Sequence, residues 1–191
     1  MSFIPLSAHL HIVIDLETLD TSPTSLVLSI GAASGYQQPL LTPIQWNLEL
    51  SSQMLKGRTS SVATRDWWTK QPAEVQEAAT CNPRQTRAAL EEFCAWFTAL
   101  SSQQGDTPVS IWGNSPSFDL TILANLLTQY GFPVPWKYFQ EKDLRTFGAC
   151  MGESFRESRE AAANTLAHSA KADAVAELAF ILRHLREERT R

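Results

Sequence analysis

Two acidic residues that follow the first apolar run have the spacing of a metal-binding pair. Asp15 and Glu17 come directly after the apolar residues 12–14 and are separated by one leucine. Because alternate side chains of a strand point to the same face, both carboxylates project together and repel each other unless a cation lies between them. Mg²⁺ prefers carboxylate oxygens as ligands. The pair indicates a divalent-metal site, although a strand that ends in solvent could carry the same two residues.

A second acidic position opens a helix later in the chain. The segment Trp112–Asp119 reads as the end of a buried strand, a loop that contains Asn114, and the first turn of a helix. An acidic residue is also favoured in a first turn by the helix dipole alone. We therefore expect Asp119 to contribute to the same acidic site, with ordinary helix electrostatics as the alternative.

A third position pairs a histidine with an aspartate. His168 and Asp173 are five residues apart at the head of the last helix. On one continuous helix this spacing amounts to a net rotation of roughly 140°, so the two side chains would diverge. They converge only if His168 lies on the preceding loop, and Ser169 is a suitable N-cap for that arrangement. A histidine beside a carboxylate cluster is a candidate general base.

The elements that must position these residues begin with strands and then alternate. Apolar runs bounded by turn residues predict strands, and apolar residues at helical spacing predict helices. Asn82-Pro83-Arg84-Gln85 has the form of a helix N-cap, a proline at the first helical position and a capping box. The strands expected are His9–Asp15, Leu26–Ile30, Ile44–Leu50, Pro108–Trp112 and Trp136–Phe139. The helices expected are Asp66–Trp68, Pro72–Ala79, one that follows Asn82, Phe118–Tyr130, one that opens near Asp143, and Ser169–Arg189.

This order predicts an α/β fold in a single domain, residues 1–191, with helices on a mixed β-sheet. Short turns between the first three strands predict an antiparallel meander, to which the later strands add in parallel. We expect the acidic residues to meet where the strands of this sheet end.

The three acidic motifs, in this order, resemble those of the DEDDh exonucleases of the ribonuclease H-like superfamily. They are D-x-E-T from Asp15, N-x-x-x-F-D ending at Asp119, and H-x-x-x-x-D from His168 to Asp173. The resemblance extends to about Leu178, and no motif position departs from the pattern. It implies a ribonuclease H-like fold and a 3′–5′ exonuclease that releases nucleoside 5′-monophosphates from DNA or RNA.

Three further features resemble the exonuclease VIII-like subgroup, which includes bacterial 3′–5′ exoribonucleases. These are the tryptophan pair Trp67–Trp68, the stretch Asp143–Thr146 and the compact length of 191 residues. The subgroup assignment depends on less specific features than the three acidic motifs.

The resemblance also implies roles for the acidic residues. Asp15, Glu17 and Asp173 would hold the metal that carries the attacking water, Asp15 would bridge to a second ion, and Asp119 would support that second ion. His168 would take the proton from the water. The implied cofactors are two Mg²⁺ or Mn²⁺ ions, and a pair of ions roughly 3.5–4 Å apart suits phosphodiester hydrolysis.

Six other residues are candidates for contact with the substrate, and four of them have a plain structural alternative. An exposed aromatic side chain can stack on a nucleobase, but a tryptophan or phenylalanine can equally belong to the core. Similarly, an asparagine can cap a loop and an arginine can be a surface residue. The candidates are Thr18, Leu19, Asn114, Phe118, Trp68 and Arg145.

Composition restricts the classes of protein to which this chain can belong. The net charge of −4 argues against a broad non-specific nucleic-acid binder, but not against an acidic site that metal neutralises. Three cysteines without a C-x-x-C pair argue against a disulfide framework and suit the cytoplasm. The apolar start reads as a strand and not as a signal peptide, and no apolar run is long enough for a membrane span.

Two other functions stay open at this point. One is a nuclease restricted to short oligonucleotides, which the acidic balance favours slightly. The other is a non-catalytic nucleic-acid-binding module on the same fold, which the loss of a carboxylate would have favoured. The expected partner is the 3′ end of a nucleic acid, and the sequence does not decide between a monomer and a homodimer.

Overall fold

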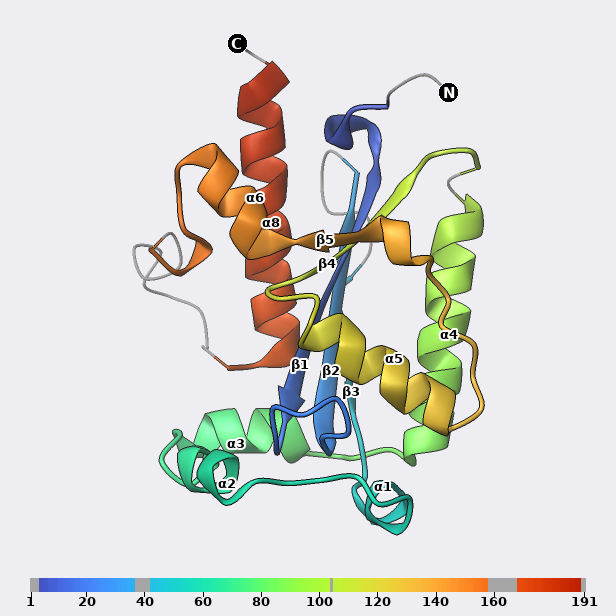
Figure 1. Ribbon diagram of the computed structural model, residues 1–191, viewed down its shortest axis with the longest axis vertical. Helices are drawn as coiled ribbons and strands as arrows, with labels where there is room; N and C mark the ends of the chain where they lie inside the picture. Colours follow the sequence, from blue (N-terminus) through green and yellow to red (C-terminus); the bar gives the residue numbers. More distant parts are fainter. Residues whose placement is uncertain (1–3, 37–41, 104, 158–167, 190–191) are drawn as a thin grey trace.

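The computed structural model describes residues 4–36, 42–103, 105–157 and 168–189. Its centre is one mixed sheet of five strands in the order β3-β2-β1-β4-β5 (Figure 1). β1 pairs antiparallel with β2, and β2 with β3, whereas β1–β4 and β4–β5 are parallel. The strands are β1 (Leu10–Thr18), β2 (Val27–Gly35), β3 (Ile44–Asn47), β4 (Val109–Gly113) and β5 (Glu141–Asp143). The predicted α/β fold, an antiparallel meander extended by parallel strands, is confirmed.

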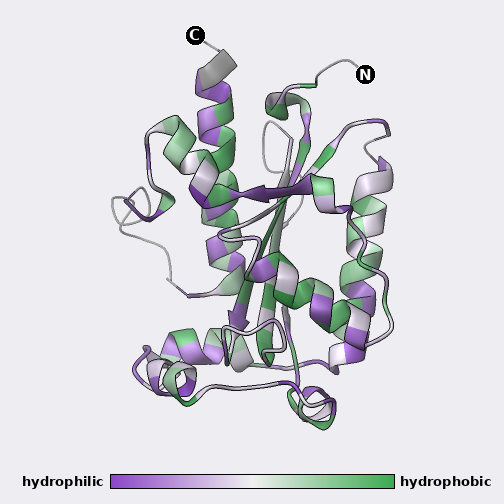
Figure 2. Cartoon of the chain, viewed as in Figure 1, coloured by the Kyte–Doolittle hydropathy of each residue, from purple (hydrophilic) through white to green (hydrophobic). Residues whose placement is uncertain are grey.

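Helices cover both faces of this sheet and one end of it (Figure 1). Helices α4 and α5 pack on one face, and α6 and α8 on the other. Helices α1, α2 and α3 lie at the end of the sheet to which β1 points. The bounds are α1 (Ser51–Leu55), α2 (Val62–Trp68), α3 (Ala73–Thr80), α4 (Thr86–Gln103), α5 (Asp119–Gln129), α6 (Leu144–Met151) and α8 (Ala170–Arg189). Hydrophobic and hydrophilic residues alternate along α4, α5 and α8 in Figure 2, as in helices with one buried face.

The central strand β1 divides its side chains between the two faces. Leu10, Ile12, Ile14 and Leu16 belong to the core under α4 and α5. Val13 belongs instead to the core under α6 and α8. Because side chains alternate along a strand, Asp15 and Glu17 point to the α8 side. The fold thus turns both acidic residues of β1 toward the helix that carries Asp173.

Most predicted elements are present, but several predictions about their bounds are wrong; the second strand, for example, continues to Gly35 and does not end at Ile30. β1 does not end at Asp15 but continues to Thr18, with a register irregularity between Glu17 and Thr18. The capping box at Asn82–Gln85 does not begin a helix, because Arg84 exchanges backbone hydrogen bonds with the end of β3 and helix α4 begins at Thr86. Trp136–Phe139 is not a strand.

The strand expected at Trp136–Phe139 lies a few residues later. Tyr138–Gln140 forms a short 3₁₀ helix, η2, and the strand β5 begins at Glu141. Trp136 is buried in the core under α4 and α5, where it packs on Phe93 and Phe97. The apolar character of Trp136 therefore reflects its burial in the core and does not indicate a strand.

Within the described residues, no helix has the length and apolar character that a membrane crossing requires.

Candidate active site

The close approach between the start of α8 and the sheet depends on a glycine in β2. Gly31 pairs with Asp15 across the β1–β2 ladder. A Cβ at Gly31 would lie 2.1 Å from the backbone of Ala170, at the start of α8. Lys171 also donates its backbone N–H to the Gln45 side chain of β3, at 3.1 Å. The helix N-terminus is therefore held directly against the strand beside Asp15, which brings Asp173 to the carboxylates of β1.

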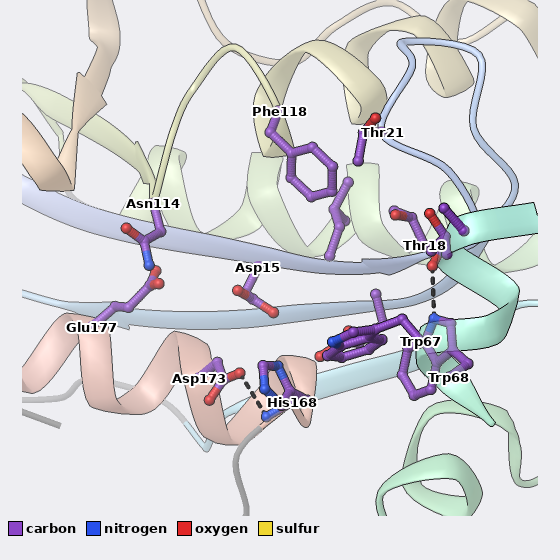
Figure 3. Close-up of a pocket in the computed structure, with 14 residues that line it drawn as sticks. Asp15, Thr18, Thr21, Trp67, Trp68, Asn114, Phe118, His168, Asp173 and Glu177 are labelled. Atoms are coloured by element: carbon purple, nitrogen blue, oxygen red, sulfur yellow. Dashed lines mark hydrogen bonds between the residues drawn. The ribbon is translucent and has the colours of Figure 1, made fainter. Parts of the chain in front are cut away.

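The histidine lies just outside this helix, as the spacing predicts. His168 precedes Ser169, and α8 begins at Ala170. The backbone of His168 has φ 63°, a left-handed conformation that is uncommon for a residue with a side chain and occurs often at functional sites. Its backbone N–H donates to Oδ2 of Asp173 at 3.1 Å (Figure 3). Its ring meets that of Trp67 edge to face, with centroids 4.9 Å apart. These two contacts fix the histidine next to Asp173.

The carboxylate from α5 enters the site from beneath β1. Asp119 is 3% exposed and accepts the backbone N–H of Leu16 through Oδ1, at 3.2 Å. Gly113 ends β4 beside it, and a Cβ there would lie 3.1 Å from the Asp119 side chain. The parallel pairing of β1 with β4 places the start of α5 next to Asp15. The absence of a side chain at Gly113 and the buried hydrogen bond from Leu16 therefore hold this carboxylate in place.

These residues line or border a pocket with a volume of about 490 Å³. Asp15, Asp173 and His168 lie in its middle, and Glu17 also lines it (Figure 3). An aromatic end contains Trp67, Trp68 and Phe118, together with Leu16, Thr18, Thr21, Ala63 and Thr64. Asn114 and Glu177 form the opposite end, where their side chains lie near each other in Figure 3. The pocket is thus a groove with an aromatic end, an acidic centre and a polar end.

Burial and like charges make the acidic centre electrostatically unfavourable without a cation. The pKa of Asp15 is raised well above its usual value by burial, and then by the charges of Glu177, Asp119, Glu17 and Asp173. Burial likewise raises the pKa of Asp119 to about 7, although hydrogen bonds from backbone N–H groups and the charge of Arg145 oppose that shift. A cluster of this kind is stabilised by divalent cations, which favour the ionised carboxylates.

One set of side chains already has the spacing of metal ligands. Single donor atoms of Glu17, His168 and Asp173 all lie within 4.8 Å of one another. This set contains the predicted base, His168, in addition to two of the predicted ligands. Asp15 adjoins it at the pocket centre (Figure 3). The structure therefore brings together all five of the residues that the sequence motifs single out, with Asp119 buried behind Asp15.

The residues proposed from sequence as substrate contacts lie in three different places. Thr18, Trp68, Asn114 and Phe118 line the pocket. Leu19 does not line it, but packs against the cluster formed by Leu28, Trp68, Val75 and Ala79. Arg145 lines a neighbouring pocket and donates from Nε to Oδ1 of Asn114 at 3.3 Å.

The two neighbouring tryptophans have different environments. Trp68 is 7% exposed, and its indole N–H donates to the Thr18 carbonyl at 2.9 Å, which ties α2 to the end of β1 (Figure 3). Trp67 is 38% exposed and packs on His168. Trp68 is therefore largely a core residue with one edge at the pocket, and Trp67 offers more surface to a ligand.

Sequence reasoning missed Glu177. This side chain is 1% exposed, lines the polar end of the pocket, and is the largest charge contribution to the raised pKa of Asp15. Its signal was available, because residues four apart on a helix share a face and Glu177 follows Asp173 by four. The three motifs end at Asp173 and contain four carboxylates, whereas the structure brings a fifth, Glu177, to the site.

The sequence was next compared with known protein families. A family model described as the 3′–5′ exoribonuclease Rv2179c-like domain matches residues 10–183. The chain belongs to this family. The match spans every acidic motif and includes Glu177. The prediction of a 3′–5′ exonuclease, an enzyme and not a binding module, is confirmed by this membership. No curated protein sequence matches the chain.

Solved structures with the same fold include E. coli exonuclease I. Its complex with a dT13 oligonucleotide shares 18% sequence identity at a TM-score of 0.66, over 92% of this chain and 40% of that one. Its complex with a dA16 oligonucleotide gives 15% identity and a TM-score of 0.67, over 94% and 42%. The chain therefore spans less than half the length of these proteins. The likeness confirms the predicted fold.

Proposed function

We propose that this 3′–5′ exonuclease uses two divalent metal ions to remove nucleotides one at a time from the 3′ end of single-stranded RNA. The observation that carries the proposal is the convergence of four acidic side chains and His168 in one groove with an aromatic end, with Asp119 buried close enough to Asp15 to act on its charge. RNA is supported by the description of the family. The solved complexes of exonuclease I hold DNA oligonucleotides, so DNA is the second substrate to test.

The donor set fits divalent metal. Asp15, Glu17, Asp119 and Asp173 offer hard carboxylate oxygens and no thiolate, which suits Mg²⁺ or Mn²⁺ better than a structural zinc. Burial and mutual repulsion raise the pKa of Asp15 and of Asp119, so positive charge at this position is stabilising. Asp15, Glu17 and Asp173 would hold one ion, and Asp119 would support a second beside Asp15. When bound, such ions supply charge neutralisation and acidify water.

His168 is placed to act as the general base. In the proposed reaction, water attacks the terminal phosphorus and the bond from phosphorus to the 3′-oxygen of the preceding nucleotide breaks. The attacking water loses a proton to the neutral His168 ring, and the 3′-oxygen of the shortened chain leaves as an oxyanion that takes a proton from solvent water to become a 3′-hydroxyl. The contact with Trp67 orients the imidazole for this step, and the hydrogen bond from the backbone N–H of His168 to Asp173 holds the backbone of the histidine in place. The product is a nucleoside 5′-monophosphate.

The aromatic end of the groove suits the terminal nucleoside. Phe118 and Trp67 are partly exposed there and offer flat apolar surface for a base. Thr18, whose hydroxyl donates to the Asp20 carbonyl at 2.7 Å, lines the same end of the groove. The terminal base would pack at the aromatic end while its 5′-phosphate reaches the acidic centre.

The proposal is tested with 5′-labelled RNA and DNA single strands of equal sequence. The wild-type protein is incubated with Mg²⁺, with Mn²⁺, or with excess chelator, and the products are separated by length and by nucleotide analysis. We expect a ladder that shortens from the 3′ end, release of 5′-monophosphates, faster digestion of RNA, and no digestion in chelator. Digestion that persists in chelator would contradict the metal requirement, and faster digestion of DNA would contradict the proposed substrate.

A pair of aspartate variants separates this activity from a contaminant. Asp15→Asn removes a proposed ligand and should reduce digestion at least 10³-fold, an order-of-magnitude expectation for a metal site that loses a ligand. Asp106→Asn is the matched control, because Asp106 is exposed and lines neither pocket of the site. Equal digestion by both variants would refute the assignment of the groove.

A further inference from the structure

A second pocket adjoins the polar end of the groove and has no role in the proposed chemistry. Its volume is about 710 Å³, and it lies between α6 and the residues that follow α6. Asn114 lines both pockets, so the two adjoin at this residue. The second pocket also contains Arg145, Arg156 and Ser154. A path therefore leads from the aromatic end, past the carboxylates and Asn114, to a pair of arginines.

The fold fixes the first arginine at the boundary between the pockets. Asp143 is the N-cap of α6 and accepts the backbone N–H of Arg145 at 3.0 Å. Arg145 therefore lies in the first turn, from where its Nε donates to Asn114. Its charge also opposes the rise in the pKa of Asp119. Arg145 is thus close enough to the acidic centre to act on it and still lines the second pocket.

The second arginine follows a tightly held turn. Helix α6 ends at Gly152, which has φ 74°, and Glu153 donates its backbone N–H to the Gly148 carbonyl at 3.0 Å. Phe155 is buried and packs edge to face on Phe180 of α8, with centroids 5.6 Å apart. This anchor places the next residue, Arg156, at the exposed side of the pocket.

The pocket is cationic on balance. Among its lining residues within the described chain, Glu153 is the sole carboxylate. Its two oxygens meet Arg183 at 2.8 Å and His184 at 3.1 Å. Those partners belong to α8 and do not line the pocket. Two arginines, Arg145 and Arg156, thus line the pocket in a protein whose net charge is −4.

We propose that this second pocket binds the nucleotide that precedes the scissile bond, with Arg156 contacting its 5′-phosphate. The inference rests on the proposed function, since it places the scissile phosphate at the acidic centre. The terminal nucleoside occupies the aromatic end, and the remaining strand, which carries further phosphates, leaves past Asn114 toward the arginines. Arginine suits this task because its guanidinium presents a planar pair of donors to phosphate oxygens.

Two dinucleotides that differ by one phosphate test the proposal. One has a free 5′-hydroxyl and the other has a 5′-phosphate, which stands where the next backbone phosphate of a longer strand would be. For the wild-type protein we expect the 5′-phosphate to raise kcat/KM about tenfold, the lower end of what a hydrogen bond to a charged group contributes. In Arg156→Ala this advantage should vanish, while the rate on the unphosphorylated dinucleotide stays within about twofold. Arg156→Lys should retain part of the advantage.

Binding gives a readout that does not depend on hydrolysis. A labelled RNA pentanucleotide is titrated at several salt concentrations into Asp15→Asn and into the double variant with Arg156→Ala, and affinity is followed by fluorescence anisotropy. Loss of one phosphate contact to a single strand should reduce the slope of log K against log salt by about 0.7. Arg84→Ala in the same background is the matched control, because Arg84 pairs with Glu92 and lines neither pocket.

The outcomes separate the two proposals. Absence of metal-dependent hydrolysis of every substrate would refute the proposed function, and the salt slope would still test the second pocket. Hydrolysis that proceeds normally, with an unchanged 5′-phosphate advantage and salt slope in Arg156→Ala, would refute the second pocket alone. Equal losses on both dinucleotides would refute it too, because they would show a general effect at the acidic centre.

Discussion

Burial of Asp119 makes the stability of the metal-free protein depend on pH in a direction opposite to ordinary acid unfolding. Asp119 is 3% exposed, and burial raises its pKa to about 7 from a usual value of 3.8. Below pH 3.8 the carboxyl group is protonated in both the folded and the unfolded chain. Between 3.8 and about 7 the unfolded chain loses the proton while the folded chain keeps it, so the stability falls as the pH rises.

The magnitude follows from the two pKa values. Their difference amounts to about 4 kcal/mol at 1.36 kcal/mol per pKa unit, and this destabilisation is complete only above pH 7. Between pH 5 and pH 8 the part that develops is about 2–3 kcal/mol. Asparagine has nearly the same shape and cannot ionise. Asp119→Asn should therefore remove this pH-dependent part from the free energy of unfolding.

Hydrogen bonding adds an offset that pH does not change. The carboxylate accepts backbone N–H groups of Leu16, Asn114 and Asp119 itself, and an asparagine amide retains an acceptor for only part of this set. Leaving a buried donor unsatisfied costs about 1–3 kcal/mol. The informative quantity is thus the difference between variant and wild type as a function of pH. It should move in favour of Asp119→Asn by about 2–3 kcal/mol from pH 5 to pH 8.

Urea unfolding with chelator at pH 5, 6, 7 and 8 measures this quantity. Asp106→Asn, at an exposed aspartate, serves as the control and should show no such trend. Excess Mg²⁺ at pH 8 should then stabilise the wild type more than Asp119→Asn, because a ligand stabilises the state that binds it. A difference between Asp119→Asn and wild type that is constant across this pH range would refute the argument.

Two further predictions concern the groove. His168→Ala should lower kcat by about 10²–10⁴, the usual cost of losing a positioned base, with the unfolding free energy nearly unchanged; a loss below about threefold at saturating Mg²⁺ would contradict the base role. Glu177→Gln should raise the melting temperature of the metal-free protein, because it removes the largest like charge beside Asp15, and should weaken Mn²⁺ binding several-fold in calorimetry. Unchanged melting and unchanged Mn²⁺ affinity would show that Glu177 does not act on the site.

The sequence alone determined the chemistry of the site. Asp15 and Glu17 had to share a face because they are alternate residues of one strand, and the geometry of a helix required His168 to precede α8 if it was to meet Asp173. Both inferences depend on local geometry, which a short stretch of chain fixes by itself. The mixed sheet followed from the order of the elements, and the family match agrees with the motifs.

Several boundaries were decided by contacts between distant segments. The apparent capping box at Asn82–Gln85 obeys local rules, yet Arg84 pairs with the backbone of Asn47 and Glu49. Trp136 has an apolar character that suits a strand, but it fills the core against α4. In both cases the local preference for a helix or a strand is overridden by hydrogen bonds and burial that depend on residues remote in sequence. No local sequence pattern predicts these contacts.

The burial of the site residues and their distances from one another were also decided only by the tertiary structure. Gly31 looks like a strand terminus in the sequence, but it is the point where α8 reaches the backbone beside Asp15. Glu177 faces Asp15 because that close approach sets the rotation and height of α8 on the sheet, and Asp119 has a raised pKa because α5 begins beneath β1. Residue types and spacing specify which groups can react, whereas their burial and mutual repulsion depend on how the elements pack, since both vary with distances through space and not along the chain.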